Sequence, residues 1–251
     1  MGQRRARGPP VQRPCHPRTQ QGVGGPLSAP AESWRCSDQV AEHWVVHEDA
    51  WLVALSKPAG LLSVPGRGPD KADCLWTRAL ERWPEALVVH RLDQATSGLM
   101  LFARNADVQR QLGTAFAHQR VHRYYEAVVH GAVHGTPDRD GWSNIRLPIG
   151  RAWLQRPRRH IDTLLGKPSL TRYRPLATDP ATHTSRIALQ AITGRTHQLR
   201  VHLQAIGHPI VGDALYGRTD GAPRMMLHAC RLQLVHPGTG RELLLQDAPD
   251  F

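Results

Sequence analysis

The run HRLDQATSG at residues 90–98, followed by LMLFAR, decides how the rest of the sequence is interpreted. Residues 86–89 and 98–103 are apolar and predict two short strands on either side of a polar loop. Asp93 lies in that loop, beside Arg91. A carboxylate next to a guanidinium stays ionised, which suits either a nucleophile or a structural salt bridge, and a salt bridge is the commoner case.

Outward from this run, short strands outnumber helices. Strands are expected over residues 44–47, 51–55, 124–129, 172–176, 186–192 and 232–235. Helices are expected over residues 71–83, from a cap at Asn105 to 119, and over 196–206. The polar stretch 131–168 predicts hairpins or long loops. Because most connections are too short for regular βαβ units, the expected class is α+β around a largely antiparallel sheet.

Composition indicates a polyanionic partner. The 251 residues carry 32 Lys and Arg against 21 Asp and Glu, a net charge of +11. Such a surplus favours nucleic acid through counterion release and electrostatic steering. We expect a cytoplasmic protein, because there is no secretory signal, no bilayer-length apolar run and no CxxC pair. The cysteines are Cys15, Cys36, Cys74 and Cys230.

Two domains of different character are expected. Residues 1–37 are basic and rich in Pro and Gly, so they predict a disordered extension. This extension either touches phosphates or is inert. Residues 38–251 carry the periodic apolar pattern of a folded domain.

Two further segments carry polar groups. On the helix expected over residues 196–206, His197, Arg200 and Gln204 lie opposite the apolar stripe, so this face either receives a phosphate near the helix N-terminus or is simply solvated. Tyr125, on an expected strand, either stacks on a base or belongs to the core.

No cofactor or metal is expected. The sequence has no GxxxxGK[ST], GxSxG or GxGxxG motif. The histidine spacings also build no metal site: His118 and His122 are four apart, but Glu does not follow His118.

Together these segments resemble the RluA-type pseudouridine synthases. The run at residues 90–98 is similar to that family's central motif, and RYYEAVV at 123–129 resembles its tyrosine-bearing strand. GRTHQLRVHLQAIGHPIVGDALYG at 194–217 and KPAGLLSVPG at 57–66 resemble its third signature and its opening. The resemblance spans about residues 46–237, and no S4 RNA-binding domain is visible.

The resemblance implies the pseudouridine synthase catalytic core: a curved, mixed, mostly antiparallel sheet with flanking helices and a central cleft. It implies an isomerase that converts specific uridines in structured RNA to pseudouridine without a cofactor. A monomer is expected, because the sequence shows no heptad pattern and no long apolar edge. SVPGR at 63–67 and RPR at 156–158 resemble the branch that acts on both ribosomal and transfer RNA.

Two rival functions make different predictions. A non-catalytic RNA-binding or RNA-folding module on the same fold would tolerate loss of Asp93 or Tyr125, and both are present. A hydrolase with a carboxylate nucleophile would need a second acid near the site. The nearest one in a motif is Asp213, which has the pattern of a turn residue.

The resemblance also assigns roles to residues. Asp93 would attack the base or the ribose, or act as a base toward the ribose. Arg200 would keep Asp93 ionised, with Arg195 as the alternative, and Tyr125 would stack under the uracil and serve in the final proton removal. Contacts with RNA are expected from Arg91, Arg195, His197, Lys57 and Arg158.

Overall fold

The computed structural model describes residues 40–68, 71–217 and 221–251. The extension expected over residues 1–37 lies outside this part of the chain. The main sheet has ten strands: β1 (Val45–Glu48), β2 (Leu52–Lys57), β3 (Leu87–Val88), β4 (Ser97–Ala103), β5 (His122–His130), β6 (Ser143–Ile145), β9 (Thr171–Asp179), β10 (Thr184–Ala191), β11 (Leu227–Val235) and β12 (Glu242–Gln246). A separate hairpin pairs β7 (Ile149–Arg151) with β8 (Arg159–Ile161).

The described α-helices are α1 (Leu75–Arg82), α2 (Ala106–Ala117) and α3 (Gln198–Ala205); the 3₁₀ turns η1 (Glu42–Trp44) and η3 (Trp153–Gln155) supplement them. In the part of the chain that the structure describes, no helix combines the length and the apolar character needed to cross a bilayer. The expected α+β class with a mixed, mostly antiparallel sheet is confirmed.

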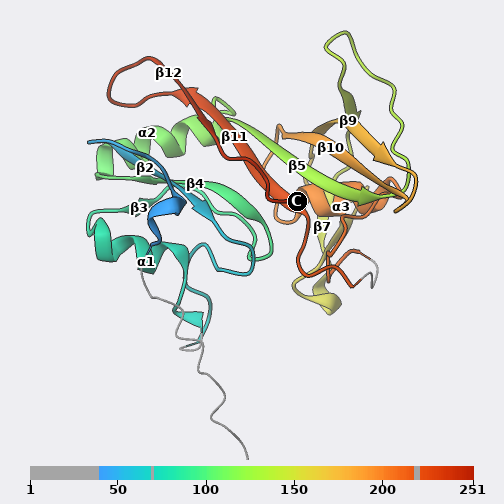
Figure 1. Ribbon diagram of the computed structural model, residues 1–251, viewed down its shortest axis with the longest axis horizontal. Coiled ribbons are helices and arrows are strands. Elements are labelled where there is room, and N and C mark those ends of the chain that lie inside the picture. The colour runs from blue at the N-terminus through green and yellow to red at the C-terminus, as the bar shows by residue number, and fades with distance from the viewer. Residues whose placement is uncertain (1–39, 69–70, 218–220) are drawn as a thin grey trace, which may run out of the picture. The chain divides into compact units, whose positions relative to one another are not determined.

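Strand β11 joins the two halves of the sheet. The strand order is β1-β2-β4-β11-β5-β10-β9-β6, with β3 beside β4 and β12 beside β11. β11 and β5 run together through the middle, with β2, β4 and α1 on one side and β9, β10 and α3 on the other (Figure 1). β11 pairs antiparallel with β5 and parallel with β4.

Both faces of β4 are buried, which explains its unbroken apolar sequence. Leu99 and Leu101 belong to a core cluster with Leu112 of α2. Met100 and Phe102, which alternate with them along the strand, belong to another cluster with Leu75 and Ala79 of α1 and with Trp83, the C-cap of α1. The strand is therefore covered by a helix on each face, and Asp93 lies in the loop that leads into it.

Several predicted boundaries were wrong for identifiable reasons. The first helix begins at Leu75 and not at residue 71, because Cys74 is its N-cap and forms a reciprocal capping box with Thr77. The last predicted strand begins at Leu227 and not at residue 232, and β12 was not predicted. Asn105 caps α2 as predicted, since its side chain accepts a hydrogen bond from the Val108 amide.

Candidate active site

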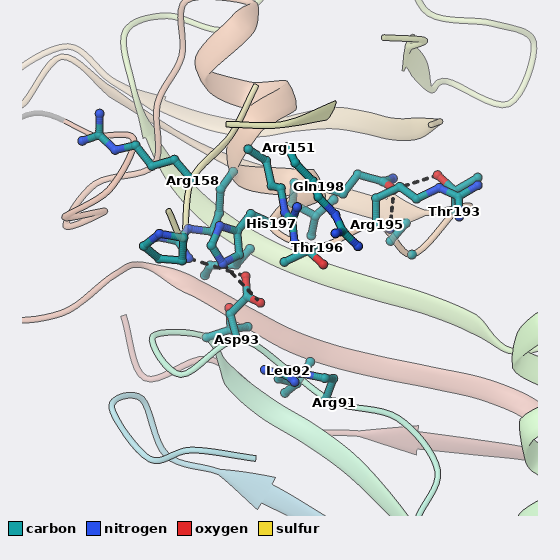
Figure 2. Close-up of a pocket in the computed structure, with 18 of the residues that line it drawn as sticks. Arg91, Leu92, Asp93, Arg151, Arg158, Thr193, Arg195, Thr196, His197 and Gln198 are labelled. Carbon is teal, nitrogen blue, oxygen red and sulfur yellow. Dashed lines mark hydrogen bonds and ion pairs between the residues drawn. The ribbon is translucent and has the colours of Figure 1, made fainter. Parts of the chain in front are cut away.

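A pocket of about 680 Å³ opens where the two halves of the sheet meet. Among the described residues that line it, nine are arginines and Asp93 supplies the one carboxylate. Asp93 points from one side of the pocket toward His197 on the other, and Arg151, Arg158 and Arg195 also line it (Figure 2). The lining arginines are Arg67, Arg91, Arg123, Arg151, Arg156, Arg158, Arg159, Arg195 and Arg200. Such a pocket is suited to a polyanion.

Asp93 lies in a turn between β3 and β4. The Thr96 amide donates a hydrogen bond of 3.0 Å to the Asp93 carbonyl, which closes the turn. The Asp93 side chain is 23% exposed, so a substrate can reach it. Its Oδ2 lies 3.5 Å from Nη1 of Arg200, and its Oδ1 lies 3.9 Å from Nε2 of His197. Of the two arginines considered as partners, Arg200 is the one placed beside the carboxylate.

Arg200 is buried and held by a second carboxylate. Its Nε and Nη2 donate to the two oxygens of Asp213, at 2.7 and 2.6 Å. Burial alone would lower the pKa of Arg200, but the ion pair with Asp213 and the charge of Asp93 outweigh it and raise the pKa. Arg200 therefore stays charged, with one nitrogen facing Asp93. Of the two alternatives for this helix face, the solvated one does not describe Arg200, which is 5% exposed.

Asp213 has two structural roles. It caps a turn, as predicted, because its Oδ1 accepts from the amides of Leu215 and Tyr216. It is also the counter-ion of Arg200, which the sequence analysis did not predict. The signal was available, because a buried arginine needs an acid and the same signature carries one.

His197 is oriented by a residue that the sequence analysis also missed. Its Nδ1 lies 2.8 Å from Oη of Tyr216, and the Arg159 amide donates to the same oxygen at 2.7 Å. The Asp93 carboxylate offers Nε2 only an acceptor, which favours the ring proton on Nε2, and Nδ1 then accepts from the Tyr216 hydroxyl. Burial lowers the pKa of His197, although the Asp93 charge opposes this.

Tyr125 lines the same pocket from β5 and is half-buried. It pairs with Leu189 of β10 and packs against the core cluster of that half of the sheet. Burial raises the pKa of its hydroxyl, and the negative charge of Asp93 raises it further, while Arg123 lowers it. The hydroxyl is therefore protonated at neutral pH.

Lys57, one of the residues predicted to contact RNA, does not line the pocket. Its side chain is fully buried, and Nζ donates to the carbonyls of Pro58, Leu61 and Gln94 at 2.8, 2.8 and 3.1 Å. Burial lowers its pKa to about 7, although the charge of Asp93 raises it. Lys57 holds the loop after Asp93 in place through Gln94.

The other residues predicted to bind RNA are placed at the pocket. Arg91, Arg158 and Arg195 are exposed lining residues, and His197 is half-buried. Nε of Arg195 donates to the Pro168 carbonyl at 3.3 Å.

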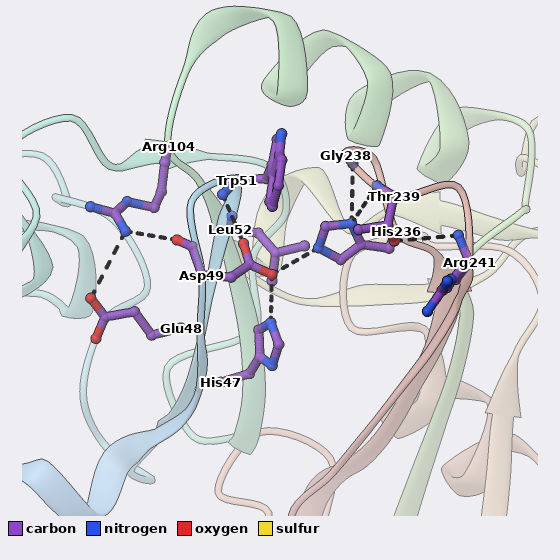
Figure 3. Close-up of polar contacts among 10 residues, drawn as sticks. All are labelled: His47, Glu48, Asp49, Trp51, Leu52, Arg104, His236, Gly238, Thr239 and Arg241. Atoms are coloured by element: carbon purple, nitrogen blue, oxygen red, sulfur yellow. Dashed lines mark hydrogen bonds and ion pairs between the residues drawn. The ribbon is translucent and has the colours of Figure 1, made fainter.

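One group of side chains away from this pocket has the composition of a metal site. His47, Asp49 and His236 place three ligand atoms within 4.8 Å of one another. However, Nδ1 of His236 accepts from the amides of Gly238 and Thr239, so its Nε2 carries the proton and donates to Asp49 (Figure 3). The cluster is therefore a set of hydrogen bonds that links two turns, and not a preformed metal site.

Comparisons with known proteins agree with this geometry. The family model described as RNA pseudouridylate synthase matches residues 51–205. The dual-specificity RNA pseudouridine synthase RluA of Vibrio vulnificus is 41% identical over 199 residues, 77% of this chain and 78% of that protein. Its counterpart from Escherichia coli is 38% identical over 215 residues, 84% of this chain and 95% of that protein.

A solved structure agrees as well. Human RNA Pseudouridylate Synthase Domain Containing 1 superimposes with a TM-score of 0.67 at 29% identity, over 82% of this chain and 83% of that one. The chain belongs to the RNA pseudouridylate synthase family. It is an RNA pseudouridine synthase, an isomerase that acts on RNA, as predicted, and the non-catalytic alternative is not favoured.

Proposed function

We propose that this chain isomerises uridines in both ribosomal and transfer RNA, with Asp93 as the reacting carboxylate. The naming of relatives 36% to 41% identical as dual-specificity enzymes supports the two classes of substrate. The runs at residues 63–67 and 156–158, which resemble the same branch, point in the same direction.

The reaction breaks the bond between N1 of the uracil and C1′ of the ribose and forms a bond between C5 and C1′. The hydrogen on C5 leaves as a proton, and N1 gains a proton, so nothing is oxidised and no group is donated. The reaction therefore requires no cofactor, and we propose a monomeric, cytoplasmic enzyme that uses none. Light scattering and activity after dialysis against a chelator test the monomer and the absence of a metal.

The observation that carries the proposal is the environment of Asp93. It is the carboxylate of a pocket lined by arginines, and Arg200 faces it at 3.5 Å. An ionised, partly exposed carboxylate is what each route requires, whether it attacks the base, attacks the ribose or removes a ribose proton.

The surrounding residues support complementary roles. Tyr125 offers an aromatic face for the uracil and a protonated hydroxyl for the closing proton transfers. A base must first leave its stack, at about a few kcal/mol, and Arg91, at the mouth of the pocket, is placed to hold the disturbed RNA. Arg158, Arg195 and His197 contact phosphates or the sugar nearby.

The test compares cells that contain the wild-type protein, Asp93→Asn or Asp107→Asn. Asp107 is a matched control because its carboxylate is 79% exposed on α2. Carbodiimide labelling with primer-extension stops maps pseudouridine in total RNA. We expect specific stops in ribosomal and transfer RNA to vanish with Asp93→Asn and to persist with Asp107→Asn. Binding of purified Asp93→Asn to the same RNA should be retained.

Two results contradict the proposal separately. Stops that survive in the Asp93→Asn strain would remove Asp93 from the reaction. Stops that vanish in only one class of RNA would leave the role of Asp93 intact and exclude dual specificity.

A further inference from the structure

The two sides of the candidate site meet across a short contact between strands β4 and β11, the β4–β11 seam. Asp93 enters from the β4 side, whereas Tyr125 lies on β5 and Arg200 on α3, and β11 lies between β4 and β5. The parallel pairing of β4 with β11 covers two residue pairs, Ser97 with His228 and Gly98 with Ala229. The separation of Asp93 from its partners therefore depends on how this seam is held.

A chain of polar side chains, buried at Ser97 and His228, crosses the contact between β4 and β11. Nδ1 of His228 lies 2.9 Å from Oγ of Ser97, and Nη1 of Arg224 donates to the same oxygen at 3.1 Å. On its other side, Nε2 of His228 lies 3.1 Å from the carbonyl and 3.2 Å from Oδ2 of Asp247. Ser97 and His228 are 6% and 4% exposed, so these bonds are made away from bulk water.

The hydrogen-bond pattern has one consistent direction. Asp247 offers only acceptors, so Nε2 of His228 carries the proton and Nδ1 accepts from the Ser97 hydroxyl. The Ser97 oxygen in turn accepts from Arg224. Oγ of Ser97 and both ring nitrogens of His228 thereby have partners, and a buried pair held in this way has one preferred geometry.

The segment that follows β12 contacts Arg224, the last member of the network. Arg224 forms an ion pair with Asp250, and its guanidinium lies 5.0 Å from the ring centroid of Phe251. The guanidinium of Arg186, on β10, lies 5.4 Å from the same ring, and Arg186 also bonds Glu126 of β5. Residues 247–251 therefore tie β4, β11 and the β5–β10 pair together.

The order Ser97–His228–Asp247 has the composition of a hydrolytic triad, but the arrangement does not suit a nucleophile. The Ser97 oxygen is buried and accepts from Arg224, which lowers its basicity. A role in holding the loop of Asp93, four residues earlier, is consistent with all of these contacts.

We propose that Ser97, His228 and Asp247 are positioning residues, which fix Asp93 relative to Arg200 and Tyr125 across the β4–β11 seam. The inference rests on the proposed role of Asp93. A reacting group displaced by about 1 Å loses about a hundredfold in rate, so the network acts on the chemical step and not on RNA binding.

The test uses Ser97→Ala, which removes the central hydroxyl, and Ser185→Ala as a matched control. Ser185 is 1% exposed, and its hydroxyl donates to the Gly131 carbonyl and accepts from the Val133 amide, at the other end of β10 from the pocket. Ser97→Thr, which keeps the hydroxyl, serves as the conservative rescue. The substrate is the RNA fragment identified by mapping, carrying uridine tritiated at C5, since the reaction releases the C5 hydrogen to water.

We expect kcat to fall about tenfold to a hundredfold in Ser97→Ala, with Kd for the RNA within twofold of wild type. Ser97→Thr should recover most of the wild-type kcat. Ser185→Ala should keep kcat within twofold of wild type, although it should lose about as much thermal stability as Ser97→Ala. If Ser97→Ala does not fold, Asp247→Asn replaces it as the test variant. Its kcat should fall by a smaller factor, and its Kd for the RNA should again stay within twofold of wild type.

Equal kcat values for Ser97→Ala and Ser185→Ala would show that the network only stabilises the fold, and would overturn the proposal. Asp93→Asn, assayed in parallel, separates the two failures. An active Asp93→Asn overturns the proposed function, whereas an inactive Asp93→Asn beside a fully active Ser97→Ala overturns the positioning role alone.

Discussion

Arg200 is the side chain on which the geometry of the site depends most. Its guanidinium uses two nitrogens for Asp213 and directs the third toward Asp93. Because the guanidinium is planar, the bidentate pair fixes the direction of Nη1, which a lysine could not do. The position of Arg200 therefore determines where a positive charge meets the Asp93 carboxylate.

The first prediction concerns the counter-ion. Asp213→Asn keeps an oxygen for the turn amides but removes the charge opposite the buried Arg200. We expect the free energy of unfolding to fall by about 3 kcal/mol, because removing one partner leaves an uncompensated buried charge. We also expect kcat to fall, since Arg200 is free to move onto Asp93. Urea unfolding measures the first effect, and a loss no larger than that of exposed Asp107→Asn would contradict it.

The same pair predicts a pH dependence. Burial would raise the pKa of Asp213, but hydrogen bonds from Arg200 and from two backbone amides outweigh it and lower the pKa. A carboxyl whose pKa is lowered by folding stabilises the protein above its unfolded pKa of about 4, and this contribution is lost as the pH falls further. The stability difference between wild type and Asp213→Asn should thus shrink below about pH 4. A difference that stays constant in urea titrations from neutral to acid pH would contradict this reasoning.

At the scale of elements, β4 and β11 approach each other closely at Gly98. Gly98 has a φ of +105°, and a Cβ there would lie 2.5 Å from the Ala229 carbonyl oxygen and 2.6 Å from its nitrogen. Only glycine combines that backbone conformation with that proximity. The glycine that ends the run at residues 90–98 therefore permits the seam to form.

Gly98→Ala should destabilise the protein by about 2 kcal/mol or more, from backbone strain and from separation of the two strands. Gly113→Ala is the control, because Gly113 lies inside α2 and a Cβ added there would meet no atom within 4 Å. That change should stabilise the helix by about 0.5–1 kcal/mol. Chemical denaturation of both variants tests this prediction. Similar unfolding midpoints for Gly98→Ala and Gly113→Ala would show that β4 and β11 are not closely packed at Gly98.

Elements marked by local pattern were predictable from sequence. The apolar run of β4, the Asn105 cap and the end of α3 at Gly207, with its φ of +87°, depend on neighbouring residues alone. Strand β12 was missed because its pairing with β11 is a tertiary contact, and its exposed face weakens the apolar signal. α3 begins two residues later than predicted because His197 has a left-handed backbone, with φ +57°.

Site residues that lie in a recognisable motif were predictable from sequence, whereas the burial of individual side chains was not. Asp93, Tyr125 and Arg200 all lie in motifs, and the structure brings them to one pocket. Sequence does not show that Lys57 is buried under three carbonyls. It also does not show which of two nearby arginines turns inward, because both lie in the same signature.

At the scale of the whole molecule, positive charge is concentrated at the candidate site. The net charge is +11, and nine of the described arginines line one pocket. Binding that releases counterions weakens with salt, with a slope of about −0.7 to −0.9 per phosphate contacted in a plot of log K against log[salt].

We therefore expect RNA affinity to fall steeply with KCl, and Arg158→Ala to reduce the magnitude of the slope by about one. Arg241→Ala removes the same charge from an exposed turn between β11 and β12, outside the lining of the pocket, and should leave the slope unchanged. Fluorescence anisotropy across a KCl series measures both, and equal slopes for the two variants would show that the net charge alone drives binding.

The central place of β11 has a consequence for synthesis on the ribosome. This strand is translated long after β4 and β5, yet it lies between them in the sheet. Until it emerges from the exit tunnel, each half of the sheet carries an open edge, which is available to non-native pairing. Asp93 and its arginine partner consequently reach their final arrangement only after most of the chain has been translated, so a nascent chain holds the candidate site incomplete.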